Sequence, residues 1–235
     1  MQIYGKNVAI EKLNSNNKIN KIYLSNKFKD EEIINLIKKR NIYTKILEPR
    51  DLDKMCNGLH QGIILEVEDV KTYTYDEVIP NIDKEYPLVV ILDHLEDPHN
   101  FGAIIRSSEA FGVDAIIIPN DRSVGITSTV VKTSVGTIEK MKIVKVSNIN
   151  NTINKLKEDG YWVVATDMNG IDYQEIDYKT KIALVIGNEG KGISRLVKEN
   201  SDYLAKIPMS GTVNSLNASV ACGIFLSQIQ LNRGN

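Results

Sequence analysis

The sequence has few cysteines and no long apolar run. Cys56 and Cys222 are its two cysteines; they lie far apart and outside any CxxC pattern, so we expect free, buried thiols and no metal site. No stretch approaches the roughly 20 apolar residues that a membrane-spanning helix needs. The first residues, Met1 to Lys6, lack the apolar stretch of a signal peptide. We therefore expect a cytoplasmic protein that does not enter a membrane.

A strong excess of either charge is also missing. The chain has 29 Lys and Arg and 30 Asp and Glu, so its net charge of −1 argues against nucleic-acid binding by bulk electrostatics alone. The distribution is uneven, because residues 1–50 contain 11 basic and 5 acidic side chains whereas residues 51–80 contain 2 and 7. This local excess fits either RNA contact or an ordinary solvated helix face.

Short helical and strand patterns alternate over the first 70 residues, which predicts a compact α/β domain. The predicted elements are helix 7–13, strand 21–24, helix 30–40, strand 43–46, helix 50–56 and strand 63–67. Asp30 is the expected N-cap of its helix, and the apolar side chains expected on the buried face are Ile33, Ile34, Leu36 and Ile37.

Residues 71–87 interrupt the apolar pattern with polar residues and two prolines, and we interpret them as a linker. Beyond them the apolar runs lengthen, and each is short, β-branched and bounded by turn residues or helices. The five runs are 88–92, 115–118, 142–146, 162–166 and 182–186. Such runs predict strands covered on both faces, so residues 88–235 are expected to form a parallel sheet flanked by helices.

Three later segments contain candidate functional residues. In the first, a polar loop after strand 88–92 leads into a helix that begins near Asn100 and carries Arg106 about two turns along. α/β folds place ligands at the carboxyl ends of parallel strands. A structural role is the alternative, with Asn100 as a helix cap and Arg106 paired with Glu109.

The second segment is the glycine-rich loop after strand 182–186, with Gly187, Gly190 and Gly192. Glycines there let the backbone approach a ligand closely, although a plain tight turn is the alternative. The spacing is neither the dinucleotide fingerprint nor the P-loop. Glu189 is harder to explain structurally, because a turn needs no carboxylate.

The third segment, residues 207–226, places Ser215 and Asn217 before a helix rich in small residues. Ser215 is the candidate N-cap of that helix. Small residues allow the helix to pack closely against another backbone, within the chain or across a dimer.

In this order and spacing, the three segments resemble the SpoU/TrmH class of the SPOUT superfamily of RNA 2′-O-methyltransferases, over residues 88–230. The segments Tyr4-Gly5-Lys6-Asn7-Val8 and His60-Gln61-Gly62-Ile63-Ile64 also resemble the N-terminal RNA-binding domain of the RlmB-like branch, which methylates a guanosine in 23S ribosomal RNA. The resemblance implies an RNA substrate-binding domain over residues 1–70, with a small α/β, L30e-like fold.

The resemblance further implies that residues 88–235 form an α/β methyltransferase domain with a deep trefoil knot, and that the chain is a homodimer. S-adenosylmethionine would be the methyl donor, with no metal. The residues at its binding positions are Gly187, Asn188, Gly190, Ile207, Met209 and Leu216. The residues at the catalytic positions are Asn100, Arg106, Glu189, Ser215 and Asn217.

The roles of these residues are partly open. A guanidinium practically never deprotonates in proteins, so Arg106 is better suited to stabilise a developing alkoxide and to grip phosphate than to act as a base. Glu189 is either the base or a group that orients Arg106 and Asn100. Ser215 and Asn217 are expected to position the ribose or the donor.

Other functions are weighed against this one. A nicotinamide-dependent oxidoreductase is disfavoured, because no GxGxxG follows an early strand. A non-catalytic RNA-binding or ribosome-assembly module is a stronger alternative, but it gives no reason for Arg106, Glu189, Ser215 and Asn217 to occur together. Transfer RNA is the alternative substrate to 23S ribosomal RNA.

Overall fold

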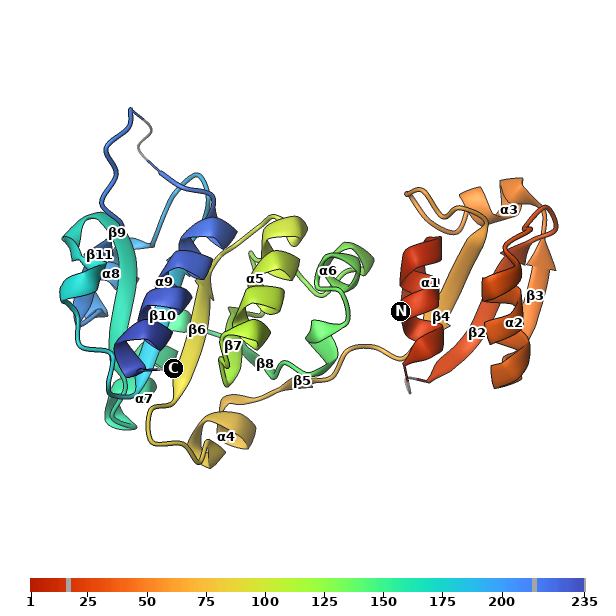
Figure 1. Ribbon diagram of the computed structural model, residues 1–235. Helices are drawn as coiled ribbons and strands as arrows, with labels where there is room; N and C mark the ends of the chain where they lie inside the picture. Colours follow the sequence, from red (N-terminus) through yellow and green to blue (C-terminus); the bar gives the residue numbers. More distant parts are fainter. Residues whose placement is uncertain (16–17, 213–214, 235) are drawn as a thin grey trace. The chain divides into compact units, whose positions relative to one another are not determined.

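The computed structural model describes residues 1–15, 18–212 and 215–234, and the chain divides into two compact units (Figure 1). The smaller unit consists of Met1–Val70 with Ile126–Gly136, and the larger unit consists of Lys71–Gly125 with Thr137–Asn235.

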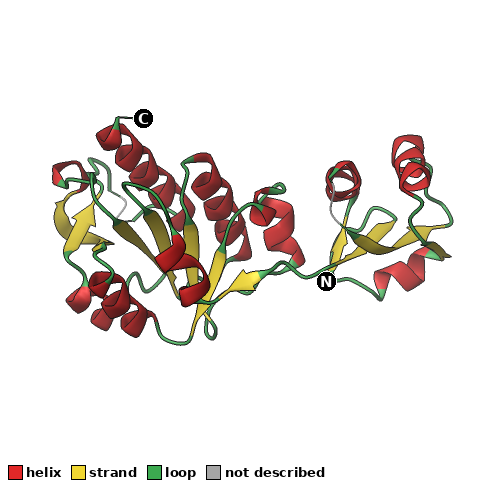
Figure 2. Ribbon diagram, turned by 90° about the horizontal axis from the view of Figure 1, so that it is seen from below, coloured by secondary structure: helices red, strands yellow, loops and turns green. Residues whose placement is uncertain are grey.

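The smaller unit contains a four-stranded sheet with strand order β1-β4-β2-β3. β4 is antiparallel to β1 and β2, whereas β2 and β3 are parallel. The strands are β1 (Gln2–Tyr4), β2 (Ile19–Ser25), β3 (Thr44–Leu47) and β4 (Ile63–Val67); the helices are α1 (Lys6–Asn14), α2 (Glu31–Arg40), α3 (Pro49–Asp53) and α6 (Ser128–Thr133). The predicted alternation is confirmed, and helices lie on both sides of this sheet (Figure 2).

Helix α2 begins where the sequence predicts. The Asp30 side chain accepts a hydrogen bond from the Ile33 backbone N–H at 3.3 Å, which confirms the predicted cap. The buried face is narrower than predicted, because Ile33 and Ile37 are buried whereas Ile34 and Leu36 are only half-buried.

The larger unit is built on a seven-stranded sheet of order β11-β9-β10-β6-β7-β8-β5, in which every neighbouring pair is parallel. The strands are β5 (Thr72–Tyr73), β6 (Leu88–Asp93), β7 (Ala115–Pro119), β8 (Ile143–Val146), β9 (Trp162–Asp172), β10 (Ile182–Gly187) and β11 (Tyr203–Lys206). All five predicted strands are present, which confirms the predicted α/β class. β5 and β11 were not predicted, because two to four residues show no pattern of their own.

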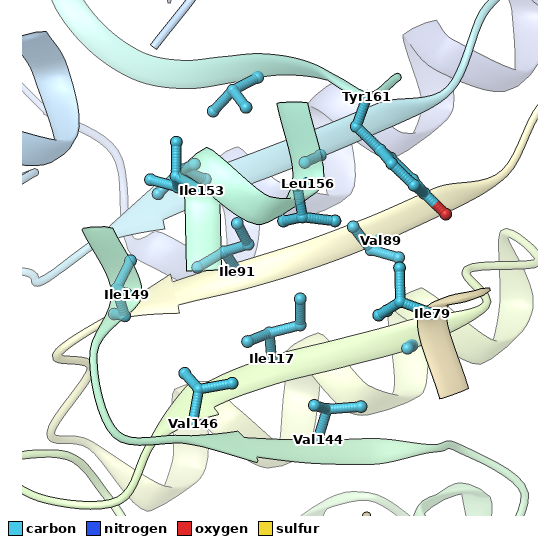
Figure 3. Close-up of a cluster of buried hydrophobic side chains, with 14 of the residues drawn as sticks. Ile79, Val89, Ile91, Ile117, Val144, Val146, Ile149, Ile153, Leu156 and Tyr161 are labelled. Atoms are coloured by element: carbon cyan, nitrogen blue, oxygen red, sulfur yellow. The ribbon is translucent and has the colours of Figure 1, made fainter. Parts of the chain in front are cut away.

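Helices cover both faces of this sheet (Figures 1 and 2). The α-helices are α4 (Tyr75–Val78), α5 (Pro98–Ala110), α7 (Ile149–Glu158), α8 (Arg195–Asn200) and α9 (Ala218–Arg233), and the 3-10 helices are η1 (Ile79–Asn81), η2 (Thr137–Glu139) and η3 (Tyr173–Glu175). α5 and α9 pack against each other, and α7 packs against α8. One face is filled by a cluster of apolar side chains from the strands and from α4, α7 and α8 (Figure 3).

Residues 71–87, expected as a linker, contain ordered elements of the larger unit. β5 pairs in parallel with β8. Tyr75, Val78 and Ile79 are buried in the cluster of Figure 3. A capping box at Thr74 and Glu77 starts α4, and its polar residues are what made this segment resemble a linker. The larger unit thus begins at Lys71 rather than at Leu88.

Both cysteines are free thiols. Cys222 is fully buried on α9, and burial raises the pKa of its thiol to about 12, whereas Cys56 is only half-buried. Among the described residues, no helix is both long enough and apolar enough to span a bilayer.

Candidate active site

A cavity of about 840 Å³ opens in the larger unit where three segments far apart in the sequence meet. They are the middle of β9, the end of β10 with the loop after it, and the chain from β11 into α9; Lys198 of α8 also lines the cavity. The cavity is lined by Thr166, Asp167, Met168, Asn169, Ile186, Gly187, Asn188, Glu189, Gly190, Lys191, Gly192, Ile193, Lys198, Ala205, Lys206, Ile207, Pro208, Met209, Gly211, Ser215, Leu216, Ala218, Ala221 and Phe225. All six residues expected to bind a cofactor are in this set.

The glycine-rich loop turns back tightly on itself. Asn188 and Gly192 form an isolated antiparallel bridge, with N–H···O distances of 3.1 and 2.9 Å. A Cβ at Gly187 would lie 2.5 Å from the carbonyl carbon of Gly192 and 2.7 Å from the nitrogen of Ile193, so no larger residue fits there. Gly192 has a φ of 65°, which glycine adopts without strain.

Asn188 holds this loop from inside. Its Oδ1 accepts hydrogen bonds from the backbone N–H groups of Gly190 at 2.9 Å and Lys191 at 3.1 Å. Its Nδ2 donates to the carbonyl of His94 at 2.9 Å, which ties the loop to the end of β6. The Asn188 side chain is therefore occupied by the protein, and the loop shape depends on it.

Asp93, which is not among the residues predicted from the sequence, lies at the end of β6 opposite Gly187 in the sheet register. Asp93 is 1% exposed and accepts a hydrogen bond from the Ser194 N–H at 2.7 Å, and its other oxygen lies 2.7 Å from Nδ1 of His94. This carboxylate fixes where α8 begins relative to the cavity. An acidic residue at a strand end was visible in the sequence, but its partner 101 residues away was not.

Asn100 contacts the cavity loop instead of capping its helix. The cap of α5 is Asp97, whose side chain accepts from the His99 N–H at 2.9 Å. Asn100 is buried, and its Nδ2 donates to Oε1 of Glu189 at 2.7 Å. This bond joins the first and second motif segments across 89 positions, so the capping alternative is wrong.

Arg106 is exposed on α5 and is not part of the cavity lining. The alternative pairing with Glu109 does not occur, because Glu109 pairs with Lys140 at 3.2 Å. In the described part of the chain the Arg106 guanidinium has no hydrogen bond or ion pair, so its donors remain available for a ligand.

In the third motif segment, Asn217 caps a helix and Ser215 lines the cavity. Asn217, not Ser215, caps α9, because its Oδ1 accepts from the N–H groups of Ser219 at 2.9 Å and Val220 at 3.3 Å. The expectation that Ser215 caps this helix is therefore wrong, since the helix begins at Ala218. Ser215 is exposed and is one of the residues that line the cavity.

An irregular stretch of β9 supplies a wall of the cavity that the sequence did not reveal. The pairing of β9 with β11 jumps from Ala165–Leu204 to Ile171–Ala205, so residues 166–170 bulge from the sheet. Asp167 in this bulge forms an ion pair with Lys198 of α8. Burial opposes ionisation of Asp167, but Lys198 and the Asn169 N–H outweigh it and lower the pKa of the carboxyl.

The arrangement suits an organic ligand held by backbone and apolar groups. In the described ranges no group of three or more His, Cys, Asp or Glu side chains could hold a metal ion. The cavity volume falls within the range of about 300–1,000 Å³ that is typical of cofactor sites. Its carboxylates are Asp167, which is neutralised by Lys198, and Glu189, which is not.

Comparisons with known proteins agree with this division of the chain. A family model described as the SpoU rRNA Methylase family matches residues 87–227. A second model, described as RNA 2′-O ribose methyltransferase substrate binding, matches residues 2–73.

Individual relatives match almost the whole chain. YacO of Bacillus subtilis, named for the TrmH family of tRNA/rRNA methyltransferases, is 41% identical over 98% of this chain and 95% of its own length. An AdoMet-bound rRNA methyltransferase from Sinorhizobium meliloti superposes with a TM-score of 0.77 at 26% identity, covering 98% of this chain and 86% of that one. A TrmH/SpoU tRNA modifying enzyme from A. aeolicus has a TM-score of 0.58 at 31% identity, covering 64% and 76%. The chain therefore belongs to the SpoU rRNA methylase family of RNA methyltransferases.

Proposed function

We propose that this protein transfers a methyl group from S-adenosylmethionine to a ribose 2′-hydroxyl of a guanosine in 23S ribosomal RNA. The observation that carries the proposal is the cavity of about 840 Å³, whose lining includes Glu189 held by Asn100. Family membership supports an RNA methyltransferase, and the name of the substrate-binding model supports the ribose hydroxyl as acceptor.

The residues present fit the proposed donor. Gly187, Gly190 and Gly192 line the cavity without side chains, so the backbone of the loop can approach a ligand closely. The apolar lining of Ile207, Leu216 and Phe225 suits a purine ring. Met209 and Gly190 complete the proposed contacts. When bound, the donor supplies a methyl group already activated on a sulfonium.

The chain then has two tasks, which are to align the 2′-hydroxyl and to remove its proton. We assign the proton to Glu189, because it is the lining carboxylate that forms no ion pair within the described ranges of the chain. The Asn100 bond holds one of its oxygens, which leaves the other to face the hydroxyl. Arg106, which has no hydrogen bond or ion pair among the described residues, is assigned to stabilise the developing alkoxide and to grip the RNA phosphate.

Ser215 and Asn217 act at the other side of the cavity. The Ser215 hydroxyl lines the space and is assigned a hydrogen bond to the ribose or donor. Asn217 uses its side-chain oxygen to cap α9, so its role is to position that helix beside the cavity.

Ribosomal RNA is favoured over transfer RNA by the extent of the structural matches. The rRNA methyltransferase from Sinorhizobium meliloti covers 98% of this chain, whereas the tRNA modifying enzyme from A. aeolicus covers 64%. Transfer RNA remains the second candidate, because the name of the Bacillus subtilis relative includes both RNAs.

The proposal includes a cytoplasmic homodimer in which the larger unit forms the deep trefoil knot. The exposed apolar side chains of α9, Val220 and Leu231, and its small residues support packing against a second copy. Sedimentation equilibrium would measure the mass, and a monomer at micromolar concentration would contradict the dimer.

Calorimetry would first measure binding of S-adenosylmethionine to the protein. Tritiated donor and total RNA that lacks the modification would then be incubated with wild type, Arg106→Ala and, as a control, Arg195→Ala. Arg195 is exposed on α8 and pairs with Glu199, outside the cavity lining. We expect label on one guanosine ribose of 23S RNA, mapped by primer extension at low nucleotide concentration, and its loss in Arg106→Ala only. Donor binding together with label on transfer RNA would favour transfer RNA as the substrate. Absence of donor binding would overturn the proposal that this protein is a methyltransferase that uses S-adenosylmethionine.

A further inference from the structure

In the smaller unit, β2 and β3 place lysines and tyrosines in alternation on one face of the sheet. Tyr23 of β2 lies opposite Lys45 of β3, and Ile22 lies opposite Thr44. The Ile22 N–H bonds the carbonyl of Tyr43 at 3.0 Å, so Tyr43 lies beside Lys21 at the start of the pair. Lys21, Tyr23, Tyr43 and Lys45 therefore form a two-by-two pattern, which we call the Lys–Tyr face.

Lysine and tyrosine are in contact within this face. The Lys21 ammonium lies 4.8 Å from the ring centroid of Tyr23 and 5.2 Å from that of Tyr43. One cation thus bridges two rings, which holds both rings in place while it keeps a positive charge between them. The Tyr23 hydroxyl donates to Glu66 Oε2 at 3.1 Å, which fixes the ring from the β4 side.

The face is accessible within its unit. Tyr43 is 66% exposed, Lys45 is exposed, and Lys21 and Tyr23 are half-exposed. The opposite face of β2, with Ile22 and Leu24, is buried in the core. The Tyr43 ring, just before the edge strand β3, is therefore not part of the buried core of the unit.

The charge of this region is positive. Lys38 and Lys39 are exposed in the last turn of α2, directly before the turn that leads to Tyr43 and β3. Residues 21–45 as a whole contain seven Lys and Arg side chains and three Asp and Glu side chains. The neighbouring carboxylate on the face is Glu66, whose oxygen already accepts from Tyr23.

We propose that the Lys–Tyr face binds an unpaired, single-stranded segment of the RNA substrate. Its bases would stack on Tyr43 and Tyr23, and its phosphates would contact Lys21 and Lys45. Every base has a π face that stacks on tyrosine, and lysine neutralises phosphate without demanding a sequence. An unpaired segment is the form of RNA whose bases reach a protein surface. The inference rests on the proposed function in taking RNA as the substrate.

The test uses the full-length protein and a fluorescein-labelled single-stranded RNA of about 12 nucleotides, a length within the site sizes of such surfaces. We expect Tyr43→Ala to weaken binding about tenfold and Tyr43→Phe to restore it, because the ring does the stacking. Lys21→Gln should lower the slope of log affinity against log salt by about 0.7, the value for one phosphate contact on a single strand.

Two matched controls separate these effects from general damage. Leu59→Ala removes a side chain of the same unit that is 76% exposed, and Lys71→Gln removes a lysine that lies 4.5 Å from the Tyr73 ring in the larger unit. Neither change should alter RNA affinity or salt slope. Circular dichroism melting of each variant would confirm that the fold is intact.

Three outcomes are distinguishable. Weaker RNA binding with an unchanged affinity for S-adenosylmethionine, and a raised KM for ribosomal RNA at constant kcat, supports the Lys–Tyr face. If Tyr43→Ala and Lys21→Gln bind RNA with wild-type affinity, the Lys–Tyr face is not an RNA site. Methyl transfer by the same proteins would still support the proposed function. The exposed edge strand β3 would then be available to another partner, such as a peptide strand. Absence of any RNA binding by wild type, together with absence of transfer, overturns both.

Discussion

The two sheets of this protein bury their side chains in different ways. All six residues of β6 and all six of β10 in the larger sheet are buried, whereas β3 in the smaller sheet has no buried residue. Helices cover the larger sheet on both faces, and its cavity lies at strand ends and in loops. The difference points to a division in which a fully buried part of the larger sheet positions reacting groups, and a half-exposed edge strand of the smaller sheet offers side chains to a partner.

The strongest test of this division removes the proposed base from the larger unit. Glu189→Gln keeps the oxygen that accepts from Asn100 but cannot take a proton, so kcat should fall about 10²–10⁴-fold. Affinities for RNA and donor should change little. Single-turnover transfer and calorimetry would measure these quantities. A kcat within a few-fold of wild type would show that Glu189 only orients Asn100.

A matched pair of core substitutions compares the two sheets directly. Ile91 of β6 is fully buried in the cluster of Figure 3, and Ile46 of β3 is 56% exposed. Ile91→Ala should lower the free energy of unfolding by about 2–5 kcal/mol, because it leaves a cavity. Ile46→Ala should change it by less than about 0.5 kcal/mol. Urea unfolding would measure both free energies. Equal losses would show that the two strands do not differ in how much their buried side chains stabilise the fold.

The glycine-rich loop offers a smaller and more local test. Gly187→Ala places a Cβ against the Gly192 and Ile193 backbone, so we expect a loss of about 1–3 kcal/mol in stability and weaker donor binding. Gly211→Ala is the control, because it lines the same cavity and its Cβ would meet nothing within 4 Å. Calorimetry with the donor product S-adenosylhomocysteine would compare them. Equal affinities would mean that the loop can relax.

The smallest expected effect is a pH dependence at Asp167. Its pKa is lowered below the ordinary 3.8, so its ionised form stabilises the folded state above that value, and this stability is lost as the pH falls through the lowered pKa. Asp167→Asn should lower the melting temperature near pH 7 slightly, and the difference from wild type should shrink as the pH falls below 3.8 and vanish once the carboxyl is protonated in the folded state as well. The exposed Asp121→Asn is the control. A difference that persists in acid would exclude the ion pair as its cause.

Much of the fold could be predicted because local patterns were sufficient. Five apolar runs became β6 to β10 in part or whole, since a strand covered on both faces must be apolar throughout. Asp30 caps α2 because its partner, Ile33, is three residues away. The predicted linker over β5 and α4 is wrong because the partners of this segment, β8 and the apolar cluster, are remote in the sequence. The error at Ser215 is local, since Asn217 two positions later is the cap.

The sequence by itself determined the α/β class, the larger sheet's central strands and two of the segments that meet at the cavity, the glycine-rich loop and the chain that leads into α9, because these depend on periodicity and residue type over short stretches. Only the tertiary structure decided that Asn100 holds Glu189, that Asp93 holds α8 through Ser194, and that the β9 bulge brings Asp167 to Lys198. Each of these contacts joins residues that are distant in the sequence. The physical reason is that a hydrogen bond or ion pair needs two groups at a set distance, and the packing of the sheet sets that distance.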